Sequence, residues 1–316
     1  MNITFRFLGA VGILTLMFFA APSFASAEVL NDPYATYMER TKDIFSGKYA
    51  GDIYIVVEDD DDLVMEMEAT MKGSAMRQAG TEETYDIAGT LAGTVQYEDT
   101  AIEYKIDVIR KGDYFYLKFK NSDVKMLRKV WVRVHADDLD SFAEEVAAAE
   151  ILGFADVLSS TAEEQAHDEA ITALEKKHHL YIVDEGPVTE KIGGKKVDTY
   201  YLKLNRSTVV AYYRELDMLL DEAAEEGTNL SFDGFREGLS DEDYVDDFVD
   251  TAYYQVSFDR RTGMPVQFGA TEQVYDGDLR TGVIAVATND KINKKVSVKA
   301  PKKWTDAADV LDRLND

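Results

Sequence analysis

Residues 65–71, Met-Glu-Met-Glu-Ala-Thr-Met, and residues 102–108, Ile-Glu-Tyr-Lys-Ile-Asp-Val, decide the fold class of this chain. In both stretches an apolar side chain occupies every second position, and polar ones lie between. Successive side chains of a β-strand point to opposite faces of a sheet, so this period predicts strands with one buried and one wet face. The same period recurs at 53–57, 115–119 and 130–134. Five or six such strands are expected between residues 48 and 134.

Turn signals separate these runs. They are the acidic segment 58–62, Gly73-Ser74, Glu98-Asp99 and the Lys-Gly-Asp sequence at 111–113. Short connections favour antiparallel neighbours, because a parallel pair of strands needs a crossover of a dozen or more residues. The sequence therefore predicts an antiparallel meander.

Helical patterns flank this meander. Asp32 and Pro33 suit the cap and first turn of a helix that presents an apolar face up to Phe45 and stops at Gly47. Farther along the chain, capping boxes at 141–144 and 161–164 each predict the start of a helix. A strand pair is expected at 180–188 and 195–204, joined at Gly193-Gly194, and a helix is expected after Asn205. The last predicted strands lie near 254–258, 266–270 and 283–287. This order predicts an α+β fold, in one domain that spans residues 28–316.

The amino terminus reads as an export signal over residues 1–27. Arg6 precedes an apolar run from Leu8 to Ala21, and Ala25-Ser26-Ala27 offers a small-residue cleavage site. The run falls short of the ~20 residues that a membrane-spanning helix needs. We therefore expect cleavage near Ala27, an extracytoplasmic (secreted or periplasmic) product, and no membrane span in the mature chain.

Composition excludes several classes of function. The 316 residues include 34 Lys plus Arg against 60 Asp plus Glu, a formal charge of −26, and no Cys. Without cysteine there is no disulfide, thiolate metal site or lipid-anchoring thiol. Nucleic acid is excluded as a partner, because its affinity for proteins comes largely from Lys and Arg on phosphates.

No catalytic or metal-binding motif stands out. The four His residues, His135, His167, His178 and His179, match no metalloprotease spacing, and no nucleophile elbow or phosphate loop is present. The acidic runs 58–62 and 241–250 lack the pattern of a calcium loop, so we interpret them as a solvated turn and a helix face. The sequence thus predicts no enzyme, no cofactor and no metal site.

The methionines are the most informative apolar residues. Met65, Met67 and Met71 share one face of a predicted strand. Methionine suits surfaces that accept variable apolar partners, and it also fills gaps in ordinary cores. The residues alone leave both interpretations open.

Three segments carry a resemblance to a known family. Residues 256–266 contain an Asp-x-x-Thr-Gly-x-Pro turn between strands, residues 195–204 form a strand before a helical insertion, and residues 296–301 suggest a closing strand followed by Pro301. Together with the order of elements, they resemble the LolA/LolB-like superfamily, in particular the LppX/LprG-type branch of extracytoplasmic lipid or lipoprotein carriers.

The resemblance implies a strongly curved antiparallel half-barrel of about ten strands, with helices covering its concave face and an apolar cavity between them. The implied function is a soluble carrier that shelters the acyl chains of a lipid or acylated ligand and meets a transient envelope protein partner. The alternative is an extracytoplasmic structural or protein-interaction domain with a filled core and no ligand. The expected wall positions are Met65, Met67, Met71, Ile102, Ile106, Phe115, Leu117, Phe119, Val256 and Phe258.

Overall fold

The computed structural model describes residues 32–41, 43–59, 62–78, 85–97, 100–121, 127–139, 141–142, 170–171, 173–224, 238–276 and 279–315. The predicted signal peptide, the capping box at 161–164 and the turn at 98–99 lie outside these residues, as does Glu144 of the first capping box.

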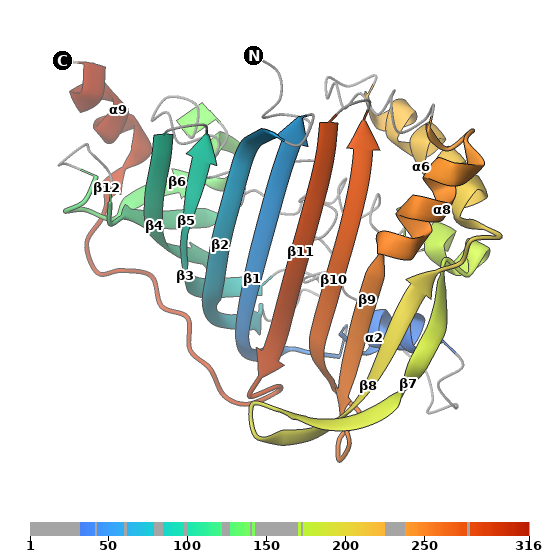
Figure 1. Ribbon diagram of the computed structural model, residues 1–316. Helices are drawn as coiled ribbons and strands as arrows, with labels where there is room; N and C mark the ends of the chain where they lie inside the picture. The colour runs from blue at the N-terminus through green and yellow to red at the C-terminus, as the bar shows by residue number, and fades with distance from the viewer. Residues whose placement is uncertain are drawn as a thin grey trace.

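One open sheet of 12 strands organises the molecule (Figure 1). Neighbouring strands are antiparallel, except for the parallel pair of β12 and β6. Across the sheet the strands are β12 (Thr305–Asp306), β6 (Val132–His135), β5 (Tyr114–Phe119), β4 (Thr100–Lys111), β3 (Tyr85–Tyr97), β2 (Asp62–Arg77), β1 (Ser46–Asp59), β11 (Leu279–Asp290), β10 (Pro265–Asp276), β9 (Tyr253–Asp259), β8 (Lys195–Leu204) and β7 (Tyr181–Ile192).

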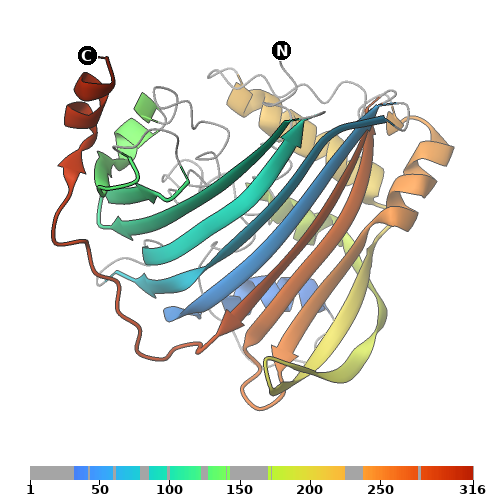
Figure 2. The ribbon, with the colours of Figure 1, turned by 60° about the vertical axis from the view of Figure 1, so that its left-hand side comes forward.

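The strands bend along their length, as Figure 2 shows, and helices lie mainly on the side toward which they bend. Among the described residues, the helical elements include α2 (Pro33–Thr41), the 3-10 turn η1 (Ala136–Asp138), α6 (Val209–Ala224), α8 (Glu242–Thr251) and α9 (Ala307–Asn315), and residues 173–178 are helical as well. The α+β class and the open sheet are therefore confirmed. The sequence led us to expect about ten strands; the described residues form 12, one of which is the two-residue strand β12.

Three local predictions were wrong. Gly73-Ser74 is not a turn but lies inside β2, paired with β1 and β3. Phe45 is not part of the first helix, which ends at Thr41, and its side chain is 51% exposed. The expected closing strand at 296–301 has no strand pairing; this segment runs past the end of the sheet toward β12 (Figure 1).

Two apolar cores share one face of the sheet. The first packs α2, α6 and α8 against β1, β2 and β8–β11, with Tyr37, Phe248 and Phe268 among its fully buried side chains. The second packs β4–β6 against Phe142 and against Val310 of α9. Met71 packs against both cores, so it marks the seam between them.

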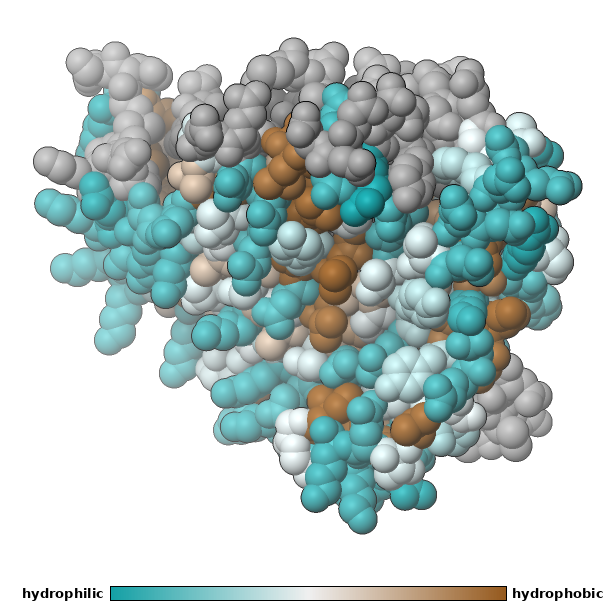
Figure 3. All heavy atoms as spheres, viewed as in Figure 1, coloured by the Kyte–Doolittle hydropathy of each residue, from teal (hydrophilic) through white to brown (hydrophobic). Residues whose placement is uncertain are grey.

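The outer face of the sheet is mainly hydrophilic. Figure 3 shows this face, with an apolar stripe over β1 and β11 between hydrophilic flanks. Ile284, 47% exposed, pairs across the strands with Tyr54, which also faces outward. A single wet face explains the two-residue period of the sequence.

Candidate functional site

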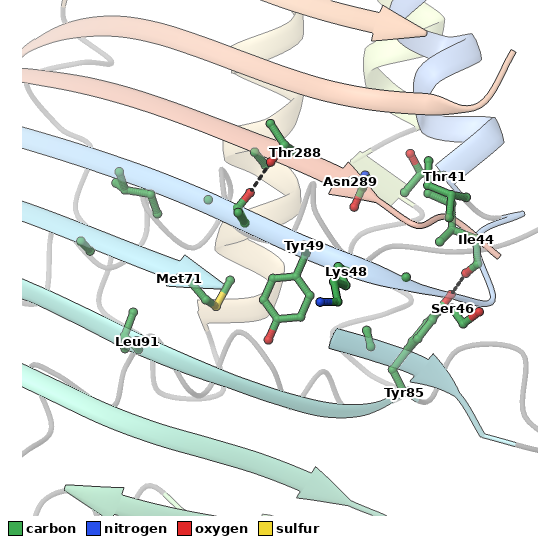
Figure 4. A pocket seen from close by; sticks show the side chains of 18 residues that line it. Thr41, Ile44, Ser46, Lys48, Tyr49, Met71, Tyr85, Leu91, Thr288 and Asn289 are labelled. Carbon is green, nitrogen blue, oxygen red and sulfur yellow. Dashed lines mark hydrogen bonds between the residues drawn. The ribbon is translucent and has the colours of Figure 1, made fainter. Parts of the chain in front are cut away.

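An apolar pocket lies on the inner face of the sheet, beside the seam between the two cores. It encloses about 970 Å³ of space, counting its open mouth. Figure 4 shows Tyr49, Met71 and Leu91 on neighbouring strands, and Thr41 and Ile44 toward the end of α2. Its lining residues are Thr41, Ile44, Ser46, Gly47, Lys48, Tyr49, Ala50, Gly51, Ile53, Ala69, Met71, Ala75, Tyr85, Leu91, Ala287, Thr288, Asn289 and Ile292.

Small residues create the hollow. Gly51 pairs with Met71 on one side and with Ala287 on the other, and Ala69 and Ala75 face the same way from β2. Because inward positions on three adjacent strands carry glycine or alanine, the two cores do not close over this part of the sheet. The wall of the pocket is therefore apolar, and its small side chains leave space above the sheet.

Tyr49 forms part of the floor. Its hydroxyl lies above Gly73 and Gly89, where an added Cβ would come within 2.5 and 2.6 Å of the hydroxyl oxygen. Only glycine leaves room for the ring to lie across the sheet there. Burial raises the pKa of Tyr49 above its ordinary value, so the phenol stays neutral and the floor carries no charge.

Hydrogen bonds fix the rim that follows α2. The Tyr85 hydroxyl donates to the Ile44 carbonyl at 2.8 Å, and Ser46 Oγ donates to the Lys294 carbonyl at 2.9 Å. The side chain of Asn293, a residue with φ +55°, accepts a hydrogen bond from the Phe45 amide at 2.9 Å and donates one to the Asp43 carbonyl at 3.0 Å. The rim is thus held from both ends of the chain.

The ten predicted wall positions share one face of the sheet, as the register shows. Met67 pairs with Val95, which pairs with Ile102, and Ile106 pairs with Phe119 across the next strands. The structure nevertheless distributes them unequally. Met65, Met67, Val256 and Phe258 lie in the first core, Ile106, Phe115, Leu117 and Phe119 lie in the second, Ile102 is 43% exposed, and Met71 lines the pocket.

Sequence reasoning missed most of the pocket. Tyr49, Gly51, Ile53, Leu91 and Ala287 line the pocket, and none of them is among the ten expected wall positions. The available signal was the recurrence of glycine and alanine at inward positions of three strands. It becomes visible only when β1 and β11, far apart in the sequence, are known to pair.

Other chemistry finds little support in the described residues. No group of three or more His, Asp or Glu side chains is placed to hold a metal ion in the described part of the chain. Among the helices of that same part, none is both long and apolar enough to cross a bilayer.

No protein-family model matches the sequence, and no curated protein matches it at a significant level. Among solved structures, the chain is similar to LprF from Mycobacterium bovis, with a TM-score of 0.34 and 8% identity, over 92% of this chain and 97% of that one. It is also similar to the lipoprotein LppX from Mycobacterium tuberculosis, with a TM-score of 0.30 and 12% identity, over 85% of this chain and 98% of that one.

Proposed function

We propose that residues 28–316 form a single exported domain that shelters the acyl chains of a lipid or acylated molecule in this pocket. The observation that supports the proposal is an apolar hollow at the seam of two otherwise packed cores. Its wall carries Ile53, Ala69, Met71 and Leu91, which present apolar surface to the hollow. Moving each CH₂ group from water to such a wall contributes about 0.8 kcal/mol, so no polar recognition is required.

In this proposal the sheet is the wall of a strongly curved half-barrel, and α2 with α6 is part of its cover. Among the ten predicted wall positions, Met71 contacts the ligand, and the others form the packed wall on either side. The leader 1–27 directs the chain to an extracytoplasmic location, where an envelope protein takes up or delivers the ligand. The domain needs no catalytic residue.

The first test asks whether the purified protein carries lipid. Organic extraction followed by mass spectrometry is expected to return a lipid in near-stoichiometric amount. The delipidated protein is then titrated with a fluorescent fatty acid, and saturable binding is expected. Absence of both lipid and saturable binding would instead favour a structural or interaction domain.

Substitutions in the pocket wall locate the binding site. Gly51→Ile fills the hollow, and it is tolerated by the backbone because a Cβ at Gly51 would meet only the Val286 carbonyl oxygen, at 3.6 Å. Met71→Glu places a carboxylate in the apolar wall. Each is expected to weaken binding of the fluorescent fatty acid at least tenfold.

Neighbouring outward residues supply matched controls. Thr70→Ile and Lys72→Glu change exposed side chains on the opposite face of β2, so the affinity should stay within about twofold of that of the unsubstituted protein. Equal losses in pocket and control variants would place the fatty acid elsewhere on the molecule.

A further inference from the structure

Glu175 is a buried carboxyl group at the junction of the cover and the sheet. It lies in the helical segment 173–178 and is 5% exposed. Tyr34 of α2 donates a hydrogen bond to its Oε1 at 3.2 Å, and Tyr181 of β7 donates to the same oxygen at 3.5 Å. The two tyrosine rings contact each other at a tilt of 38°, with centroids 4.0 Å apart. This carboxyl therefore joins three elements.

The ion pairs of this region leave Glu175 out. Lys177 and His178 of the same segment both pair with Glu215 of α6. Within the described residues, no Lys, Arg or His pairs with Glu175. A buried carboxylate without a cation is costly, so the group avoids its charge.

The groups that face Glu175 are acids and phenols. They are Asp32 before α2, Tyr34, Tyr181, Tyr212 and Tyr213 of α6, and Glu272 of β10. Burial raises the pKa of Glu175 to about 8, aided by repulsion from the other two acids and opposed by its hydrogen bonds to the two tyrosines. Burial also raises the pKa of each of the four tyrosines.

Glu272 is the second carboxyl of the cluster. It accepts a hydrogen bond from Tyr254 at 2.5 Å, and the Tyr254 ring contacts that of Tyr181 at 4.7 Å. Burial raises the pKa of Glu272 as well. Because burial raises the pKa values of the surrounding phenols, these groups stay neutral, and a change in the charge of Glu175 is not offset by them.

One short helix connects this cluster to the pocket. α2 has nine residues, with Tyr34 in its first turn and Thr41 at its end. Thr41 and the following Ile44 line the pocket. A movement of α2 that lifts Thr41 from the sheet therefore opens the pocket on that side, since a helix of this length moves as a rigid rod of ~13 Å.

We propose that Glu175, Tyr34 and Tyr181 form a proton-dependent latch: the protonated carboxyl holds α2 closed over the pocket, and its ionisation favours an open state. The inference rests on the proposed function, because α2 borders the ligand pocket proposed above. The latch gives the carrier a response to the pH of its compartment, with ligand retained in acid and released as pH rises.

Linkage sets the direction and the pH window. The closed state keeps the Glu175 proton up to about pH 8, whereas a solvated Glu in the open state loses it near ~4.3. Between these values the open fraction grows about tenfold per pH unit, and above pH 8 it levels off.

Hydrogen–deuterium exchange of the α2 amides in ligand-free protein tests the latch directly. After correction for the intrinsic exchange rate, protection is expected to fall about 100-fold from pH 5.5 to pH 7.5. Glu175→Gln keeps the shape of the side chain but cannot ionise, so its protection should change less than threefold. The matched control Glu215→Gln alters a partly exposed carboxyl nearby and should retain the full pH dependence.

A second variant keeps the test decisive if Glu175→Gln folds poorly. Tyr34→Phe retains the ring but loses the hydrogen bond, so α2 protection at pH 5.5 should drop about fivefold while the pH dependence persists. Protection independent of pH in the unsubstituted protein, or the same fall in Glu175→Gln, would overturn the latch.

Release of the fluorescent fatty acid separates the two proposals. Its dissociation rate should rise with pH in the unsubstituted protein and stay flat in Glu175→Gln. If the fatty acid does not bind but exchange follows the expected pH dependence, the latch stands and the carrier function fails. If it binds but exchange is independent of pH, only the latch fails.

Discussion

At the scale of single residues, glycine and tyrosine pair across the sheet. Tyr49 lies over Gly73 and Gly89, and Tyr104 lies over Gly93, where an added Cβ would come within 2.5 Å of the Tyr104 hydroxyl oxygen. Each ring replaces the side chains that the glycines lack. These glycines thus serve packing within strands, which explains why Gly73 was mistaken for a turn residue.

Gly73→Ala should therefore destabilise the protein far more than Gly51→Ala. The new Cβ at position 73 would lie 2.3 Å from the Ala88 carbonyl oxygen, whereas at position 51 the nearest atom is 3.6 Å away. Overpacking of this kind costs about 1–3 kcal/mol. Urea denaturation followed by circular dichroism measures the difference, and equal midpoints for the two variants would show that β2 shifts to accommodate the methyl group.

The inward face of each strand was predictable from single residues, but the pocket was not. The two-residue period put Met67 and Phe119 on the apolar faces of their own strands, and the register places both on one face of the sheet. Periodicity does not say which inward residues touch a partner and which border empty space. That depends on side-chain volume summed over paired strands, and so on long-range register.

At the scale of elements, an aromatic and charged cluster ties the C-terminal segment to β6. The Arg133 guanidinium lies 4.8 Å from the centroid of the Tyr114 ring and 5.3 Å from that of Trp304, and its Nε donates to Asp306 at 2.6 Å. The adjacent Thr305 amide donates to the Trp131 carbonyl at 2.8 Å. This cluster positions β12 and α9 at the edge of the sheet.

Arg133→Ala should loosen β12 and α9 without unfolding the rest of the sheet. Loss of two cation–π contacts is expected to accelerate amide exchange over residues 305–311 about five- to tenfold. Arg133→Lys keeps the charge but loses the planar stack, so its effect should be intermediate. As a control, Arg206→Ala removes the ion pair of Arg206 with Asp246 of α8 and should leave the exchange of residues 305–311 unchanged. Unaltered exchange in Arg133→Ala would mean that the apolar contacts of α9, made by Ala307, Val310 and Leu311, are enough to anchor it.

Sequence signals predicted those features that depend only on residues close together in the chain. The cap at Asp32 is confirmed by a 2.9 Å bond from the Ala35 amide, and Gly193-Gly194 joins β7 to β8. The prediction of a strand at 296–301 was wrong because this segment, although its residues alternate, has no partner strand. A strand requires another strand, and single-sequence periodicity does not contain that information.

At the scale of the whole molecule, the sheet is built from two chain segments that meet in its middle. β1–β6 form one side and β7–β11 the other, and the pairing of β1 with β11 joins residues more than 200 positions apart. Hairpin signals specify each half, but nothing local specifies their joint. The pocket lies beside that joint, with walls from β1, β2 and β11.

The net charge of −26 is the other property of the whole chain, and acidic residues gather on the outer face of the sheet. Burial together with Glu66, Glu58 and Glu68 raises the pKa of Tyr54, so several carboxylates crowd around this ring. Repulsion among them opposes folding at low ionic strength and weakens when salt shortens the Debye length to ~10 Å at 0.1 M. We therefore expect the melting temperature to rise between 10 and 150 mM NaCl.

Two charge variants in β2 test this explanation. Glu68→Gln removes one of the crowded acids and should raise the melting temperature by about 1–2 °C at 10 mM NaCl, while Lys72→Gln, on the same outer face, should lower it. Both shifts should shrink toward zero at 0.5 M NaCl, because screening removes the interactions that they alter. A shift that persists unchanged in high salt would trace the effect to packing of the β2 side chains instead of to the charge of the molecule.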